Sequence, residues 1–172
     1  MNEYLLLIAG GVAAYLMGSF SSAVWIGKWF YNTDVREHGS GNAGATNTIR
    51  VLGTRAGVIV MAIDIVKAWG AVMLAHLFAI DTWTEAQLVD YKIVVGSLAV
   101  LGHVFPVFTG FKGGKGVASL VGVIIALFSP YIFLLVLAWF LTVFILTRYV
   151  SLASVTASIF FAVLAIFIFH EQ

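Results

Sequence analysis

This 172-residue sequence lacks cysteine and has few charged side chains. There is no cysteine, which excludes a disulfide framework, a thiol nucleophile and a thiolate metal site. Only 10% of the residues are charged, against about 25% in an ordinary soluble domain. The net charge of +1 gives no bulk field that would attract nucleic acid, so no nucleic-acid partner is expected.

Apolar residues are present in excess. Hydrophobic residues make up 62% of the chain, and the mean hydropathy is +1.05. Such a chain cannot cover a water-facing surface with polar groups, and it is too apolar to remain disordered. We therefore expect an all-α polytopic helical membrane bundle, in which residues 1–172 form a single integral membrane domain.

Long apolar stretches divide the chain into candidate spans, because a helix needs about 20 mostly apolar residues to cross a bilayer. The clear candidates are residues 4–31, 55–80 and 151–169, with a third span in chain order starting near Tyr91. A polar stretch (residues 32–54) and an acidic linker (residues 81–90) separate the first three spans. Residues 116–146 are apolar except near Ser129 and Pro130, and they form either one long kinked helix or two short helices.

The distribution of lysine and arginine favours two short helices. With a turn at Ser129 and Pro130, almost all basic residues fall on one side of the membrane: Lys28, Arg36, Arg50, Arg55, Lys112, Lys115 and Arg148. Basic residues near short loops tend to stay in the cytoplasm. The pattern therefore predicts six spans with an extracytoplasmic N-terminus.

The first glycine-rich stretch, residues 38–50, is a candidate anion site. Glycines on both sides of Ser40 leave its hydroxyl uncrowded and its backbone N–H groups available to form an anion-binding nest. Arg50 supplies a planar fork suited to phosphate. A flexible polar loop explains the same composition. The candidate residues here are Gly39, Ser40, Gly41, Asn42, Thr46, Asn47 and Arg50.

The second glycine-rich stretch, residues 102–119, ends in a glycine and lysine run that opens a helix. A phosphate is stabilised where glycine N–H groups and a helix N-terminus converge, and Lys115 adds a point charge. The spacing does not match a Walker A loop, because Gly116 stands where serine or threonine should follow the lysine. A basic membrane anchor with a tight turn is the alternative. The candidates are His103, Lys112, Gly113, Gly114, Lys115 and Gly116.

Both stretches face the same side in the preferred topology, which predicts one site for an anionic ligand at the cytoplasmic surface. Transporters, by contrast, usually bind near the midplane between inverted repeats, and no such repeat is visible. Asp64 and Lys67 share a helix face, and we interpret them as a mutually neutralising pair that orders the bundle. The spacing of the histidines predicts no metal site, and no cofactor is expected.

Together these two stretches resemble the conserved motifs of the PlsY family, bacterial glycerol-3-phosphate acyltransferases that use acyl phosphate. Further matching positions are Gly18, Ser19, Asp64, Lys67 and the run from Arg148 to Ser154. The resemblance implies a seven-span enzyme of the bacterial inner membrane, with its N-terminus outside and its active site facing the cytoplasm. Its substrates would be acyl phosphate and glycerol 3-phosphate, and its products lysophosphatidate and phosphate.

The resemblance also implies roles for individual residues. Ser40 and Arg50 correspond to the serine and arginine that such enzymes require, and the run containing Lys115 corresponds to the stretch taken to bind glycerol phosphate. We expect Ser40, Arg50 and Lys115 to be catalytic, with Ser40 as a positioning group more than a nucleophile. The family's third motif is missing after Gln172, so we expect a C-terminally truncated chain with six of the seven spans.

Two rivals remain at this point: an anion or phosphate channel or transporter, and a non-catalytic membrane scaffold. Lipids of the membrane are the only other partners expected.

Overall fold

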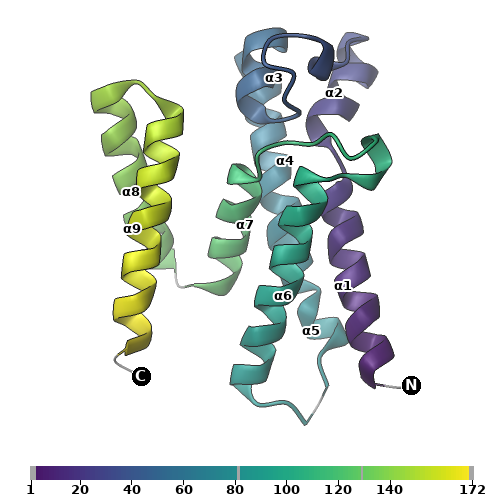
Figure 1. Cartoon of the computed structure of the whole chain (residues 1–172), viewed down its shortest axis with the longest axis vertical. Coiled ribbons are helices and arrows are strands. Elements are labelled where there is room, and N and C mark those ends of the chain that lie inside the picture. Colours follow the sequence, from purple (N-terminus) through teal and green to yellow (C-terminus); the bar gives the residue numbers. More distant parts are fainter. Residues whose placement is uncertain (1–2, 81, 129, 171–172) are drawn as a thin grey trace. The chain divides into compact units, whose positions relative to one another are not determined.

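The computed structural model describes residues 3–80, 82–128 and 130–170, and the described residues are helical or irregular (Figure 1). The chain divides into two compact units, Met1–Leu127 and Phe128–Gln172, and each is described by itself. A single domain over residues 1–172 stays a prediction. The helices of the first unit are α1 (Glu3–Ser19), α2 (Ser22–Tyr31), α3 (Ala45–Leu52), α4 (Thr54–Met73), α5 (Ala75–Phe78), α6 (Glu85–Val104) and α7 (Val117–Leu127), with short 3-10 turns η1 (Val35–Glu37) and η2 (Val107–Thr109).

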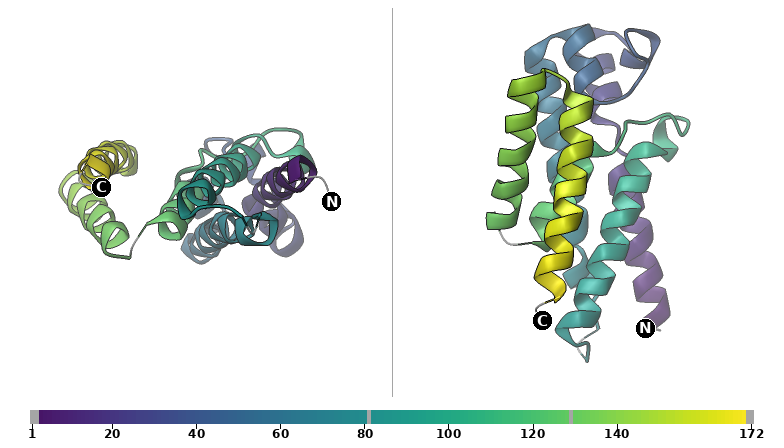
Figure 2. Two further views of the ribbon diagram at one scale, coloured as in Figure 1. Left: turned by 90° about the horizontal axis from the view of Figure 1, so that it is seen from below. Right: turned by 60° about the vertical axis from the view of Figure 1, so that its left-hand side comes forward.

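Small residues let α1, α4 and α6 approach closely in the first unit (Figures 1 and 2). A Cβ added at Gly18 of α1 would overlap the backbone of Ala99 in α6, and one at Gly102 of α6 would overlap the backbone of Tyr15. Close backbone approach of this kind is how helices gain dispersion contacts in lipid, where apolar burial gives little drive for association.

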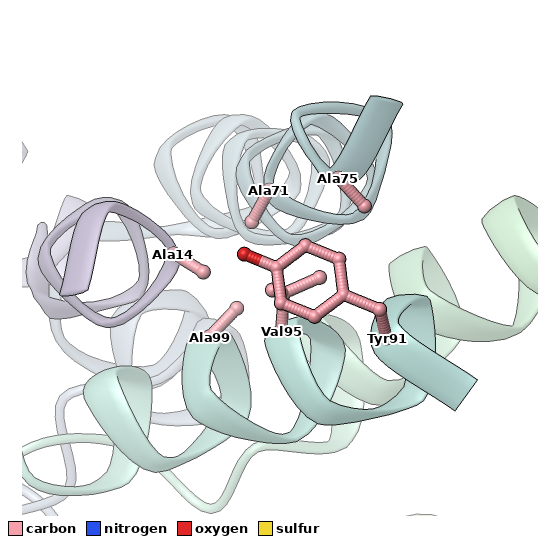
Figure 3. Close-up of a cluster of buried hydrophobic side chains, with 6 residues drawn as sticks. All are labelled: Ala14, Ala71, Ala75, Tyr91, Val95 and Ala99. Carbon is pink, nitrogen blue, oxygen red and sulfur yellow. The ribbon is translucent and has the colours of Figure 1, made fainter. Parts of the chain in front are cut away.

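Alanines of α1, α4 and α5 surround the large buried side chain of Tyr91. Tyr91 of α6 lies among Ala14, Ala71 and Ala75, as Figure 3 shows, and its hydroxyl donates to the Leu7 carbonyl at 3.0 Å. The ring fills the space that the alanines leave, and the hydroxyl keeps a hydrogen-bond partner, as a buried phenol requires.

The predicted first span is a bent pair of helices. α1 and α2 meet at 42° around Phe20 and Ser21. The bend matters for the site, because backbone carbonyls at a helix break lose their intrahelical donors.

The prediction that residues 81–90 form an acidic linker is wrong for the second half of that stretch. Helix α6 begins at Glu85, six residues before the start expected near Tyr91. The reason is a capping box: the Thr84 hydroxyl accepts from the Gln87 N–H, and the Gln87 side chain accepts from the Thr84 N–H. Hydropathy alone marks where a helix becomes apolar, whereas the cap decides where it starts.

The apolar stretch from 116 to 146 is not one continuous helix. α7 ends at Leu127 and α8 (Pro130–Thr147) begins at Pro130, followed by α9 (Val150–His170). Ser129 lies outside the described residues. In this second unit the Trp139 ring of α8 stacks on the Phe160 ring of α9 at a centroid distance of 4.7 Å.

Three helical segments of the described residues are long and apolar enough to cross a membrane: Thr54–Phe78, Glu85–Thr109 and Val150–Phe167. The bent pair of α1 and α2 makes a fourth if it counts as one span. α7 and the 131–147 part of α8 are apolar but shorter. Six spans and an extracytoplasmic N-terminus therefore stay predictions.

Candidate active site

The two glycine-rich stretches lie against each other. The segment between α2 and α3 and the segment between α6 and α7 are both at the end of the first unit away from the N-terminus (Figures 1 and 2). The Ala43 N–H donates to the Gly113 carbonyl at 3.3 Å. Residues 70 positions apart in the sequence are therefore in direct backbone contact, as a single site for one ligand requires.

An arginine strengthens this contact. Arg36 donates from Nη1 to the Thr109 carbonyl at 2.6 Å, and its Nε and Nη2 form a fork on Asp34 at 3.0 and 2.8 Å. Hydrogen bonds from Arg36 hold the pKa of the Asp34 carboxyl well below its usual range, and Asp34 raises the pKa of Arg36 in return. Lys28 adds a second cation at 3.3 Å from Asp34. This ion cluster therefore ties the segment just before the first glycine-rich stretch to the second stretch, through an arginine that stays ionised.

Asn47 organises the first stretch from inside. It is buried, and its Oδ1 accepts the Ser40 N–H at 2.8 Å while its Nδ2 donates to the carbonyls of Val35 and His38. The Asn47 side chain thus shapes the loop through hydrogen bonds to the backbone of other loop residues. The expectation that the Ser40 N–H is available for an anion is wrong, because Asn47 already accepts it.

The backbone conformation explains why glycines flank Ser40. Gly39 and Gly41 have φ values of 63° and 70°, in the left-handed region that side chains with a Cβ rarely adopt. A Cβ at Gly39 would also overlap the Asn47 amide. The resulting turn leaves the Ser40 side chain exposed, as the sequence predicted for its hydroxyl.

The glycines of the second stretch have a packing role that differs from the expected one. The Gly113 N–H donates to the Val104 carbonyl and the Gly114 N–H to the His103 carbonyl, both at 3.2 Å. These N–H groups satisfy the last carbonyls of α6 and are not free for an anion, which corrects the sequence-based prediction. A Cβ at Gly113 would overlap the His103 carbonyl, and one at Gly114 would overlap the His103 imidazole. Glycine is therefore required because the loop folds back directly onto α6.

The groups left for an anion are cationic side chains and two helix N-termini. Arg50, Lys112 and Lys115 are exposed, and the Arg50 side chain passes close to Gly39. The first stretch leads into α3 and the second into α7, so each ends at a helix N-terminus whose first N–H groups have no intrahelical partner. Asn42, Thr46 and Gly116 lie along the same segments: Asn42 is half-buried, Thr46 is exposed in the first turn of α3, and Gly116 has a φ of 80°.

A buried polar cluster adjoins the second stretch, and of its members only His103 is predicted by the sequence to lie at the site. Its members are Ser22 of α2, Asp64 and Lys67 of α4, and His103 of α6, and all four are buried. Asp64 Oδ1 accepts from the Ser22 hydroxyl and from Lys67 Nζ, both at 2.9 Å. Lys67 Nζ also lies 3.1 Å from His103 Nδ1. The Asp64–Lys67 pair is thus not self-sufficient, because it extends to His103 and so to Gly114.

Two signals in the sequence could have found these residues. The helix break beside Ser22 was present as a run of small polar residues within the first span. Asp34 and Arg36 stand immediately before the first glycine-rich stretch, and the charge distribution by itself predicts only a cytoplasmic side for Arg36. Within the described residues no group of three or more histidine, aspartate or glutamate side chains comes together to hold a metal.

Comparison with known proteins identifies the family. The family model described as glycerol-3-phosphate acyltransferase matches residues 8–171. A glycerol-3-phosphate acyltransferase of Listeria welshimeri is 43% identical over 163 residues, which cover 94% of this chain and 78% of the relative. One from Streptococcus thermophilus is 46% identical over 157 residues, covering 91% of this chain and 68% of the relative.

Solved structures agree with these relatives. The crystal structure of PlsY (YgiH), an integral membrane glycerol 3-phosphate acyltransferase, in its glycerol 3-phosphate form, matches with a TM-score of 0.80 and 42% identity. It covers 94% of this chain and 76% of that one. The lysophosphatidic acid form matches with a TM-score of 0.78 and 40% identity. The chain therefore belongs to the glycerol-3-phosphate acyltransferase family of PlsY and is an integral membrane acyltransferase.

Proposed function

We propose that this chain transfers a fatty acyl group from acyl phosphate to the 1-hydroxyl of sn-glycerol 3-phosphate, at the cytoplasmic face of a bacterial inner membrane. The observation that carries the proposal is the contact between the two glycine-rich stretches at Ala43 and Gly113. It brings the backbones of the two cation-bearing stretches into contact. Cations from both stretches would there offset the repulsion between two phosphorylated substrates.

Family membership supports glycerol 3-phosphate as acceptor, since the PlsY structures include a glycerol 3-phosphate form and a lysophosphatidic acid form. It does not favour a channel or transporter. The donor is proposed from the chemistry of the site. Acyl phosphate already carries a good leaving group, so a site made of cations, hydroxyls and helix ends needs only to position it.

The proposed reaction is a direct acyl transfer. The 1-hydroxyl oxygen attacks the acyl carbonyl carbon, the new ester C–O bond forms, and the bond from that carbon to the phosphate oxygen breaks. The hydroxyl proton passes to the departing phosphate. Lysophosphatidate and phosphate are the products, and no oxidant, metal or nucleotide is needed for the balance.

Each proposed catalytic residue has a task in this step. Arg50 and Lys115 offset the negative charge of the two phosphates, and Ser40 donates a hydrogen bond that orients one of them or the reacting carbonyl. A nucleophilic role for Ser40 would need an adjacent base. Holding two reactants in a reactive geometry supplies about 7–11 kcal/mol of the barrier, so positioning alone accounts for much of the rate.

The test is acyl transfer in proteoliposomes that contain the complete product of the parent gene, including any residues after Gln172. Labelled glycerol 3-phosphate and acyl phosphate should give lysophosphatidate, and acyl-CoA should not replace the donor. Ser40→Ala should abolish transfer, while Ser97→Ala, an exposed serine on α6, should not. Phosphate flux without acyl transfer would contradict the proposal and favour a transporter.

A further inference from the structure

The buried cluster of Ser22, Asp64, Lys67 and His103 contains more hydrogen bonds than the Asp64–Lys67 ion pair alone would form. Asp64 is 1% exposed, Lys67 8% and His103 5%, so the charges lie in an apolar bundle and their desolvation is costly. The four side chains of the cluster come from α2, α4 and α6, which are far apart in the chain. A pair that served only to neutralise itself would not need a third group from α6.

Lys67 uses each of its three ammonium hydrogens. Its Nζ lies 2.6 Å from the Phe20 carbonyl, 2.9 Å from Asp64 Oδ1 and 3.1 Å from His103 Nδ1. The Phe20 carbonyl is available because α1 ends at Ser19 and α2 starts only at Ser22. An ammonium has three donors and no acceptor, so Lys67, as the cation of the Asp64 pair, can donate to all three partners.

This arrangement assigns the tautomer of His103. A hydrogen bond from Lys67 requires a lone pair on Nδ1, so the proton of the neutral imidazole is on Nε2. The competing contact, from His103 Nδ1 to Asp64 Oδ1, is longer at 3.5 Å. Asp64 Oδ1 is also already engaged by Ser22 and Lys67 at 2.9 Å.

The other side of the ring faces the second glycine-rich stretch. A Cβ at Gly114 would overlap His103 Nε2 and would lie 2.8 Å from Cε1 and 3.1 Å from Cδ2. The Gly114 N–H donates to the carbonyl of the same histidine. Gly114 therefore packs directly against the His103 imidazole. The exposed Lys115 is the next residue in the chain.

We propose that Asp64 and Lys67 are positioning residues for acyl transfer. They fix the tautomer and the plane of His103, and His103 in turn holds the Gly113–Gly114 backbone and Lys115 in the shape that binds glycerol 3-phosphate. The role rests on the proposed function of the second glycine-rich stretch. Neither Asp64 nor Lys67 touches substrate, so their effect is on binding geometry and reaches the substrate through His103.

The kinetic test removes the pair without leaving a lone buried charge. Lys67→Met alone would strand Asp64 as an unpaired carboxylate, whereas exchanging both partners of a buried pair for apolar residues is often tolerated. The variant is therefore Asp64→Leu with Lys67→Met, in proteoliposomes of the complete gene product. Lys92→Met, a lysine on α6 outside the cluster, is the control.

We expect the double variant to fold and to raise the KM for glycerol 3-phosphate about tenfold with kcat nearly unchanged, since a misplaced loop weakens binding. Lys92→Met should keep both constants. A double variant with unaltered KM, and only a lower unfolding temperature, would show a structural role and overturn the proposal.

A second measurement reads the tautomer directly in the wild-type protein and does not depend on enzymatic activity. In wild-type protein with nitrogen-15 histidine, NMR should show the proton of His103 on Nε2, the signal being assigned by its loss in His103→Gln. In the double variant the tautomer should become mixed. A proton on Nδ1 in the wild type would overturn the proposal even if acyl transfer is normal. Absence of acyl transfer by wild type would instead refute the proposed function and leave this NMR test valid.

Discussion

Gly114→Ala is the sharpest single perturbation of the site. It adds one methyl group where the His103 imidazole already lies, with ring atoms at 2.8 and 3.1 Å besides the overlapping Nε2. Gly114 does not have a positive φ, so alanine is compatible with its backbone. The cost is therefore crowding, and the ring cannot turn away easily because Lys67 holds its Nδ1.

The expected magnitude follows from overpacking. Inserting a methyl into a well-packed region costs about 1–3 kcal/mol. If the loop moves to relieve that cost, binding of glycerol 3-phosphate weakens by about 5-fold to 150-fold, at 1.4 kcal/mol per factor of ten. The KM for glycerol 3-phosphate should rise by that range, measured in proteoliposomes over a wide range of substrate concentration.

A matched glycine and a double variant separate crowding from other effects. A Cβ at Gly70 of α4 would meet only the end of Met17 at 3.4 Å, so Gly70→Ala should leave KM unchanged. In a His103→Ala background the space for the methyl exists, so Gly114→Ala should cost less there than in wild type. Equal costs in both backgrounds, or a wild-type KM for Gly114→Ala, would refute the reasoning.

Three further predictions concern charges and the hydroxyl at the site. Arg50→Ala should abolish turnover like Ser40→Ala, with unchanged thermal unfolding because both side chains are exposed; near-wild-type turnover in a folded variant would contradict this. Lys115→Ala should raise the KM for glycerol 3-phosphate more than it lowers kcat, measured as initial rates, and an effect on kcat alone would contradict it. In the folded protein the pKa of Asp34 lies below its unfolded value of about 3.9. The ion pair of Asp34 with Arg36 therefore stabilises the fold at higher pH, and this stabilisation is lost as pH falls toward the folded pKa. The unfolding temperature of wild type minus that of Asp34→Asn should thus be constant from about pH 8 to about pH 5 and shrink below about pH 4; a difference that grows on acidification would contradict the assignment.

Helix positions could be predicted from the sequence because hydropathy is a local property. The stretch predicted for the second span, residues 55–80, corresponds to α4 and α5, and that for the last, residues 151–169, to α9. The start of α6 was missed because it depends on the capping bonds of Thr84 and Gln87, and the mean hydropathy of a window does not register two side-chain hydrogen bonds.

The residues of the candidate site could be predicted from the sequence, but their hydrogen-bond partners could not. Glycine and cation patterns marked both stretches, and the structure brings them together. The use of their N–H groups was predicted wrongly, because Asn47 and the end of α6 take them, and such partners are set by tertiary packing. The link from Lys67 to His103 spans 36 positions, so no local pattern contains it.

The central claim, that the two glycine-rich stretches bind one phosphorylated substrate together, can be tested by measuring distances from its phosphorus atom. Solid-state NMR with phosphorus-31 in bound glycerol 3-phosphate and nitrogen-15 in arginine and lysine side chains reports which nitrogens lie near the phosphate, with variants at Arg50 and Lys115 assigning the signals. We predict that the same bound phosphorus dephases the side-chain nitrogen signals of both Arg50 from the first stretch and Lys115 from the second. The nitrogen signal of Lys92 should be unaffected. Bound substrate that dephases only one of the two, or neither, would contradict the account.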